Sequence, residues 1–290
     1  MRDQQMPNSL LVAAIATSAV VGAAALVAVV VMATQESEKR KKTRMQFVSS
    51  FRHAVGRNFY SSGQPLNVFP KAELVLQNAD LLSMYRLDRI APDYLKHVLT
   101  YQAIAPGSQP ASQRYAGFQF GKLAMLGDGR AILLGSIHAR DHTFWEIQLK
   151  GSGWNVFSRQ GDGKLTLEYA LREYLVSEAM HALRVPTTRA LACYKTGETV
   201  LRAGAWRPAA VLTRTARSFV RYGTFHAVRN RSEFEELVNH VCETCDRRLL
   251  AMPWPARATT LLYAVIDRQA KLVAQWTALG FVHGVLNTDN

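Results

Sequence analysis

Residues 122–150, KLAMLGDGRAILLGSIHARDHTFWEIQLK, decide the fold that we expect for this chain. Two short apolar runs, 122–126 and 131–137, flank the sequence Gly-Asp-Gly-Arg, and an Asp-Gly pair tolerates the positive φ angles of a tight turn. This pattern predicts a β-hairpin. Residues 143–150 alternate between apolar and polar side chains, which indicates a third strand that ends on Lys150.

The segments that follow alternate between helical and extended patterns. Apolar side chains recur at helical spacing in three places, and two shorter runs have the composition of strands. The expected helices cover 165–183 and 256–279, and a third helix between them is capped by Ser232 with Glu235 in the capping-box position. The expected strands cover 189–194 and 209–215. We therefore predict an α/β fold of the α+β type, in which residues 45–112 form short helical pieces and loops.

The composition is that of a folded, basic protein. Apolar residues make up 48% of the chain and charged residues 20%, which excludes wholesale disorder. Three cysteines are too few for a disulfide framework that would stabilise a chain of this length. The single Cys-x-x-Cys at 242–245 lacks the second pair of ligands that a zinc site requires. The net charge of +13 favours an anionic partner, such as nucleic acid, an acidic membrane or ATP. Because no RNA-recognition motif, zinc finger or basic helix is visible, we expect no nucleic-acid partner.

The most apolar stretch of the sequence lies near its N-terminus. Residues 9–34 carry no charged side chain and exceed the roughly 20 residues that a helix needs to cross a bilayer. The alternative, a cleaved signal peptide, has a shorter apolar region. The basic cluster 39–44 follows, and the positive-inside rule places the rest of the chain on the cytoplasmic or matrix side. We expect a tail at 1–8, a transmembrane helix at 9–34 and a single-pass membrane protein.

Several polar residues occur in the order that a phosphate-transfer site requires. A glycine-rich turn allows phosphates to approach closely, and Lys150 supplies a fixed cation if Glu173 or Glu178 on the next helix holds it. Asp289 and Asn290 offer the hard oxygen ligands that Mg²⁺ prefers. Taken singly, each piece also has a plain structural interpretation as a hairpin turn, a solvated lysine or an exposed helix face.

A series of longer motifs between Tyr115 and Asn290 is more specific than these pieces. The motifs are YAGFQFG (115–121), LGDGRAILLG (126–135), WEIQLKGSG (145–153), SRQGDGK (158–164), LREYLVSEAMHAL (171–183), VPTTRAL (185–191), VLTRTARSFVRYGTF (211–225) and GFVHGVLNTDN (280–290). Together, and in this order, they resemble the selenoprotein O family. Members of that family look like kinases in fold, but they transfer AMP from ATP to hydroxyl side chains of target proteins.

The resemblance implies a protein-kinase-like, two-lobed fold and a role for each matching residue. Residues 113–230 would form the N-terminal lobe after a basic flank at 35–112, and residues 231–290 would begin an incomplete C-terminal lobe. Asp289 would accept the proton of the target hydroxyl, and Asn290 would bind Mg²⁺. Glu173 would pair with the phosphate-binding lysine. The residues that would bind ATP are Gly127, Gly129, Arg130, Lys150, Asp162, Gly163, Arg214 and Arg221.

The sequence departs from the family pattern in several places. Residues 154–157 replace a proline-containing stretch, and Lys164 replaces the usual arginine. The family also has a second metal-binding aspartate beyond the Asp-Asn pair, whereas this sequence ends at Asn290. We therefore expect an ATP-dependent protein adenylyltransferase that modifies Ser, Thr or Tyr hydroxyls, with little or no turnover from this chain.

Two other functions stay open at this point. One is a truncated, catalytically inactive pseudoenzyme that binds ATP, and the other is a phosphotransferase of the protein kinase type. The location is open as well, because eukaryotic members of the family are mitochondrial.

Overall fold

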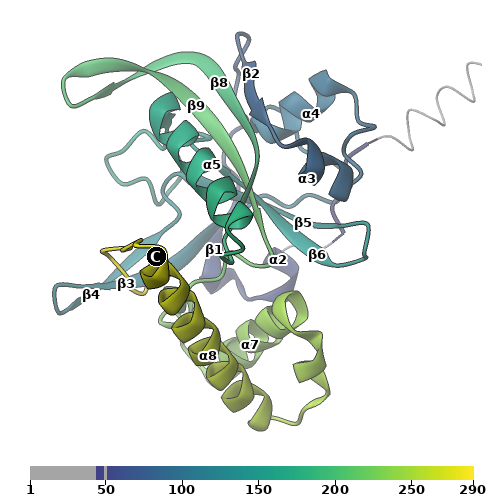
Figure 1. The fold of residues 1–290 in the computed structure, drawn as a ribbon, viewed down its shortest axis with the longest axis vertical. Helices are drawn as coiled ribbons and strands as arrows, with labels where there is room; N and C mark the ends of the chain where they lie inside the picture. The colour runs from purple at the N-terminus through teal and green to yellow at the C-terminus, as the bar shows by residue number, and fades with distance from the viewer. Residues whose placement is uncertain (1–43, 49–50) are drawn as a thin grey trace, which may run out of the picture. The chain divides into compact units, whose positions relative to one another are not determined.

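The computed structural model describes residues 44–48 and 51–290, of which Met45–Asn290 form one compact unit (Figure 1). The described chain contains two antiparallel sheets. The strands of the larger sheet are, in spatial order, β2 (Glu73–Gln77), β8 (Arg189–Arg202), β9 (Ala205–Ala216), β6 (Phe144–Lys150) and β5 (Ala131–His138), and the short β7 (Leu165–Thr166) also pairs with β9. The smaller sheet contains β1 (Tyr60–Ser61), β3 (Ser112–Gln119) and β4 (Lys122–Gly127).

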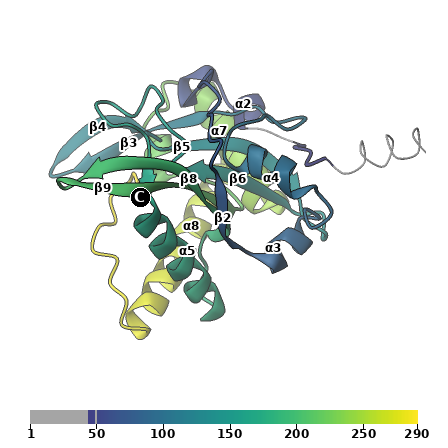
Figure 2. The ribbon, with the colours of Figure 1, turned by 90° about the horizontal axis from the view of Figure 1, so that it is seen from above.

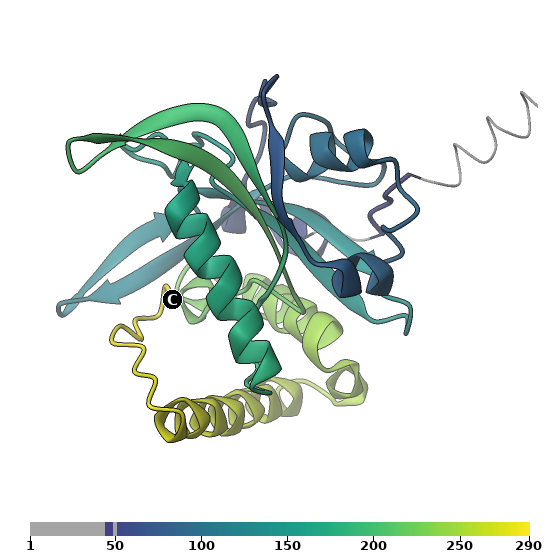
Figure 3. The ribbon, with the colours of Figure 1, turned by 45° about the horizontal axis from the view of Figure 1, so that its top comes forward.

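Helices precede, interrupt and follow these strands. They are α2 (Phe51–Ala54), the 3-10 helix η1 (Arg57–Phe59), α3 (Ala79–Met84), α4 (Pro92–Leu99), α5 (Leu167–Ala182), α6 (Tyr222–Phe225), α7 (Arg231–Cys245), the 3-10 helix η2 (Arg247–Ala251) and α8 (Ala256–Ala278). Figures 2 and 3 show the chain returning from the end of α8 toward β3 and β4, so that the last residues lie beside the smaller sheet. A hydrogen bond from the Phe118 amide to Thr288 Oγ1, at 3.1 Å, joins the two.

The larger sheet buries both of its faces. Because side chains alternate across a strand, Val211 of β9 packs in the cluster that includes Leu81 of α3 and Leu99 of α4. Its neighbours Ala210 and Leu212 pack on the opposite face, in the cluster that includes the residues of α5. Helix α5 is therefore held against the sheet by apolar contacts, and this packing fixes the polar side chains that α5 turns toward the sheet.

The predicted hairpin between residues 122–126 and 131–137 is wrong. Strand β4 pairs instead with β3, and the turn between them lies at Phe120 and Gly121, whose φ angles are 49° and 76°. Strand β5 pairs with β6 in the other sheet, with Ala131 opposite Lys150. The segment between β4 and β5 thus carries the chain from one sheet to the other.

The glycines of this segment are needed for close packing rather than for a hairpin turn. A Cβ atom on Gly127 would lie 2.4 Å from the ring of Phe157, and one on Gly129 would lie 2.5 Å from the Phe157 carbonyl oxygen. Larger side chains at either position would push the loop after β6 away from the corner between the sheets.

The other predicted elements are confirmed, with different ends. The helices predicted at 165–183 and 256–279 are α5 and α8, and the strands predicted at 189–194 and 209–215 are parts of the longer β8 and β9. The helix expected from Ser232 is α7, but its N-cap is Asn230, whose side chain accepts a hydrogen bond from the Glu233 amide. Residues 45–112 contain the strands β1 and β2 as well as helices and loops.

The predicted membrane location is corrected at this stage. No helix within residues 44–48 and 51–290 combines the length and the apolar character needed to cross a bilayer. The transmembrane helix was expected at 9–34, which lies outside the described residues. For the part of the chain that the structure describes, the prediction of a membrane location is wrong.

Glu178 fastens the second half of α5 to β8. Its carboxylate accepts hydrogen bonds from Arg189 Nη2 at 2.7 Å, from the Ala190 amide at 2.9 Å and from Asn78 Nδ2 at 2.7 Å. Burial alone would raise the pKa of Glu178, but these partners outweigh it and hold the pKa below its usual value. Glu178 is therefore a structural brace and does not pair with Lys150.

Replacing Glu178 by alanine is expected to lower the free energy of unfolding by about 2–3 kcal/mol, because Arg189 then loses its carboxylate partner. Urea unfolding followed by circular dichroism measures this loss. The matched control is Asp93→Ala, which removes a carboxylate that is 88% exposed and should cost less than ~0.5 kcal/mol. Equal losses in the two variants would contradict the role assigned to Glu178.

Candidate functional site

One cavity of about 1100 Å³ gathers residues that lie far apart in the sequence. The predicted site residues that line it are Gly127, Gly129, Arg130, Lys150, Asp162, Gly163, Arg214, Arg221, Asp289 and Asn290. Glu173 lies behind Lys150 and, with it, lines a smaller neighbouring cavity. The structure thus brings the predicted residues together, while their chemical roles stay predictions.

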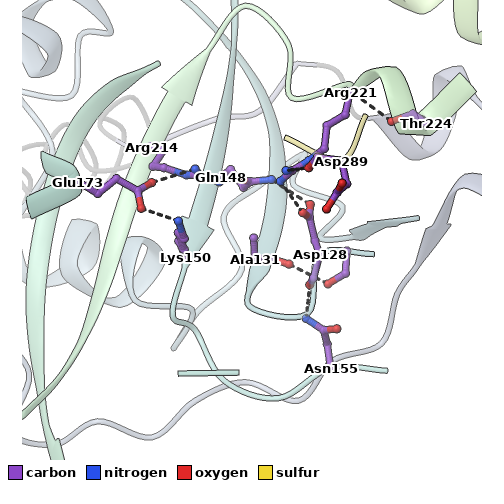
Figure 4. Close-up of polar contacts among 11 residues, drawn as sticks. Asp128, Ala131, Gln148, Lys150, Asn155, Glu173, Arg214, Arg221, Thr224 and Asp289 are labelled. Atoms are coloured by element: carbon purple, nitrogen blue, oxygen red, sulfur yellow. Dashed lines mark hydrogen bonds and ion pairs between the residues drawn. The ribbon is translucent and has the colours of Figure 1, made fainter. Parts of the chain in front are cut away.

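Glu173 of α5 holds two cations of the sheet (Figure 4). Its Oε2 lies 2.5 Å from Lys150 Nζ at the end of β6, and its Oε1 accepts a bond from Arg214 Nη1 of β9 at 2.9 Å. The predicted pairing of Lys150 with Glu173 is therefore confirmed. Thr166 caps α5 by accepting a hydrogen bond from the Tyr169 amide, which sets where the helix begins relative to the sheet.

Burial and neighbouring charges compete in this group. Burial and the charge of Arg214 lower the pKa of Lys150, against the opposing effect of Glu173. Burial alone would raise the pKa of Glu173, but the charges of Arg214 and Lys150 outweigh it, and the pKa is lowered. Glu173 is therefore ionised at neutral pH and carries the charge that keeps its two partners together.

The polar contacts continue from Arg214 through Gln148 and Asp128 to Arg221 (Figure 4). Arg214 Nη2 donates to Gln148 Oε1, and Gln148 Nε2 donates to Asp128 Oδ2 at 3.1 Å. Asp128 Oδ1 then accepts a bond from Arg221 Nη2 at 3.0 Å. We call the row Lys150–Glu173–Arg214–Gln148–Asp128–Arg221 the polar chain.

Sequence reasoning missed two members of the polar chain. Asp128 occurs in the Gly-Asp-Gly motif, where it was interpreted as a turn residue, yet it is only 3% exposed. Gln148 is fully buried on β6, two residues before Lys150. Residues two apart on a strand share one face, so a glutamine at that spacing from the lysine was a usable signal.

The last residues of the chain meet the cavity through main-chain contacts. Arg221 Nη1 donates to the Asp289 carbonyl oxygen at 2.5 Å, and the Gly223 amide donates to the Thr288 carbonyl oxygen at 2.6 Å. Gly117 of β3 packs directly on this segment, because a Cβ atom there would lie 2.8 Å from Asp289 Cγ. Asp289 is thereby placed between the smaller sheet and the arginine.

The opposite rim of the cavity is formed by the loop after β6 and the end of β8. Asp162 accepts two bonds from Arg202, from Nη2 at 2.6 Å and from Nη1 at 2.9 Å. These hydrogen bonds outweigh burial and lower the pKa of Asp162. Gly163 has a φ of 68°, and a Cβ atom there would lie 2.0 Å from the Gly153 carbonyl oxygen. Arg202 was not predicted, since it is the last residue of β8, a strand that extends beyond the predicted range 189–194.

Comparison with protein families assigns nearly all of this unit to one family. The family model described as "Protein adenylyltransferase SelO" matches residues 42–290. This match includes both sheets, the polar chain and the last residues of the sequence.

Curated bacterial proteins named "Protein nucleotidyltransferase YdiU" are similar to the chain over much of this range. The protein of Methylorubrum populi is 50% identical over 207 residues, which are 70% of this chain and 41% of the relative. That of Halalkalibacterium halodurans is 46% identical over 222 residues, 75% of this chain and 45% of the relative. That of Clostridium botulinum is 44% identical over 237 residues, 81% of this chain and 48% of the relative. The chain therefore spans about half the length of the curated relatives that it matches.

Glu173→Gln should lower stability at neutral pH, because it removes the charge between Lys150 and Arg214 while keeping the shape. A carboxylate whose pKa lies below its ordinary value of 4.5 stabilises the fold above that value and loses its effect as the pH falls through the folded pKa. We expect the variant to be less stable by about 2 kcal/mol at neutral pH, with a difference that narrows below about pH 4.5.

Urea unfolding of both proteins across this pH range measures that difference. The control is Glu168→Gln on the same helix, whose side chain is 64% exposed and pairs with Arg172 on the surface. That substitution should have a small effect at every pH. A loss in Glu173→Gln that does not change with pH would contradict the charge argument.

Proposed function

The chain belongs to the SelO family of protein adenylyltransferases, and we propose that it transfers AMP from ATP to hydroxyl side chains of target proteins. The observation that carries this proposal is that four members of the polar chain, Lys150, Arg214, Asp128 and Arg221, line the same cavity as Asp289 and Asn290. A triphosphate needs several fixed cations, and hydrogen bonds between charged partners are about twice as strong as neutral ones.

The cavity supports a nucleotide by its size and by the character of its walls. Its volume of about 1100 Å³ is at the upper end for pockets that enclose a small ligand. We propose that Lys150, Arg214 and Arg221 hold the phosphates. Gly127 and Gly129, together with Arg130, would contact the nucleotide from one side, and Asp162 and Gly163 would contact it from the opposite rim.

We propose Asp289 as the proton acceptor of the reaction. The hydroxyl oxygen of the target would attack the α-phosphorus of ATP, and the bond from that phosphorus to the bridging oxygen would break. Pyrophosphate would leave with the bonding electrons, while the hydroxyl proton would pass to the Asp289 carboxylate. Proton transfer of this kind accelerates a reaction by about 10²–10⁴-fold when the acceptor is well placed.

We further propose that the side-chain oxygen of Asn290 binds Mg²⁺. Amide and carboxylate oxygens are ligands that this ion accepts, and Asn290 lines the cavity beside Asp289. Within the described ranges, no three His, Cys, Asp or Glu side chains group closely enough to hold a metal ion on their own. Phosphate oxygens of ATP and water would contribute further ligands, and the ion would neutralise phosphate charge.

The same family membership supports a kinase-like, two-lobed fold as a proposal. Residues 113–230 would form the N-terminal lobe, which contains every strand of the sheet that bears Lys150 except β2. Residues 231–290 would begin the C-terminal lobe with α7 and α8, and residues 35–112 would flank the N-terminal lobe. This division is consistent with the mixed α/β architecture and the antiparallel sheets.

ATP labelled at the α-phosphorus should transfer its label to the chain itself or to an added protein, at the low rate that the sequence predicts for this chain. Lys150→Ala should reduce this transfer by at least about 100-fold, because a phosphate loses its fixed cation. The matched control is Lys122→Ala on the exposed strand β4, which should transfer label normally. Label that transfers only from the γ-position would replace adenylylation by phosphorylation, and ATP binding without transfer of either label would indicate an inactive nucleotide-binding protein.

A further inference from the structure

We infer that Asp128 is a positioning residue, which orients Arg221 and through it fixes the main chain at Asp289. The consequence for catalysis rests on the function proposed above, whereas the mechanical link between the three residues does not. Asp128 is among neither the residues predicted to bind ATP nor those predicted to bind the metal.

The Asp128 carboxylate cannot easily move away from Arg221. The residue is 3% exposed, and its Oδ2 is already bonded to Gln148. Its main chain is fixed at both ends, because the amide donates to the Gln113 carbonyl oxygen at 2.9 Å and the carbonyl oxygen accepts from Asn155 Nδ2 at 2.8 Å. The turn between the two sheets therefore presents one carboxylate oxygen, Oδ1, to the arginine in a fixed direction.

Arg221 transmits this direction because its guanidinium is planar and rigid. Nη2 bonds Asp128 at 3.0 Å, Nη1 bonds the Asp289 carbonyl oxygen at 2.5 Å, and the ring of Tyr115 lies 4.5 Å from the guanidinium carbon. When one nitrogen, the plane of the group and its attachment to the side chain are all fixed, the other nitrogen is fixed as well. The position of the Asp289 carbonyl is thus set from the turn that contains Asp128.

The segment that bears Asp289 depends on contacts of this kind. Residues 281–290 form neither helix nor strand, and Val282 is 84% exposed. Bonds from Phe118 and Gly223 reach this segment at Thr288, and the bond from Arg221 follows at the next residue. Among these three, the Arg221 bond has a charged donor and is expected to be the strongest.

The electrostatic cost of Asp128 also favours a positioning role over a stabilising one. Burial raises the pKa of Asp128, even though the charges of Arg221 and Arg214 oppose the change. A buried ion pair seldom stabilises a fold more than apolar packing would. We therefore assign the Asp128 carboxylate the role of orienting Arg221 rather than that of stabilising the fold.

Hydrogen exchange followed by mass spectrometry tests the link without any nucleotide. Asp128→Asn keeps the shape and one acceptor oxygen but removes the charge. Amides in residues 281–290 should exchange about 10-fold faster in this variant, because a charge-assisted bond that holds the segment is weakened. The control is Asp141→Asn, which makes the same change in an exposed turn where the carboxylate bonds Thr143, and exchange in 281–290 should not change.

A double-mutant cycle separates this link from general loss of structure. Arg221→Gln alone should speed exchange in 281–290 to a similar degree, and the double variant should add nothing further. If the two single effects simply add, or if Asp128→Asn leaves exchange in this segment as it is in the native sequence, the inference is overturned. Thermal melting of each variant shows whether the fold is intact.

Titration with ATP then connects the link to the proposed function. Asp128→Asn should weaken ATP binding by about 10-fold, since a poorly oriented arginine contacts phosphate less well. If the native sequence binds no ATP, the proposed function fails and the exchange experiment still decides the inference. If ATP binds equally well to both proteins, Asp128 does not orient Arg221 for the nucleotide and the inference fails.

Discussion

Glu173 bonds two cations at once, Lys150 at 2.5 Å and Arg214 at 2.9 Å, and the rest of the site depends on this arrangement. Cations repel each other strongly in the poorly screened wall of a cavity. Glu173 and Asp128 are therefore interleaved with Lys150, Arg214 and Arg221 along the polar chain. With both carboxylates ionised, the five groups leave one net positive charge, so that the wall attracts an anion without being driven apart.

Strand geometry explains how the fold holds these groups in line. Gln148 of β6 stands directly opposite Arg214 of β9 in the antiparallel register, so the two side chains share a face of the sheet. Lys150 follows Gln148 on the same face, where α5 supplies Glu173. A shift of one residue in the pairing of β6 with β9 would turn Gln148 and Lys150 to the opposite face, away from Arg214 and Glu173. The apolar packing on both sides of the sheet prevents such a shift.

Local patterns were sufficient to predict the three long helices α5, α7 and α8 and several strands, whereas the choice of Glu173 over Glu178 as the partner of Lys150 came from the family resemblance. They failed where the outcome depends on contacts between distant segments. The apolar runs around Gly127 have the composition of a hairpin, yet β4 finds its partner in β3, because strand pairing is decided by the whole sheet and not by the turn alone. The roles of Asp128 and Gln148 were not predicted for a similar reason. Their burial depends on contacts between the two sheets and a loop, which a local sequence pattern does not show. The membrane prediction rested on the uncharged run at 9–34 and its basic flank, and the described residues, which do not include that run, contain no helix able to cross a bilayer.

The polar face of β6 also reaches beyond the cavity, toward α7. Glu146, two residues before Gln148, accepts a hydrogen bond from the Phe219 amide at 2.6 Å, and its other oxygen lies 3.4 Å from His240 Nε2. Phe219 lies in the linker that leads to Arg221, so this bond braces the linker from the same strand that bears Lys150. An apolar side chain at position 146 would avoid the desolvation cost of a buried carboxylate. It would also leave the Phe219 amide without this acceptor, and the segment that leads to Arg221 would lose its hydrogen bond to β6. The buried Glu146 therefore links Arg221, at one end of the polar chain, to β6 through Phe219. The other end, Lys150, lies on the same strand.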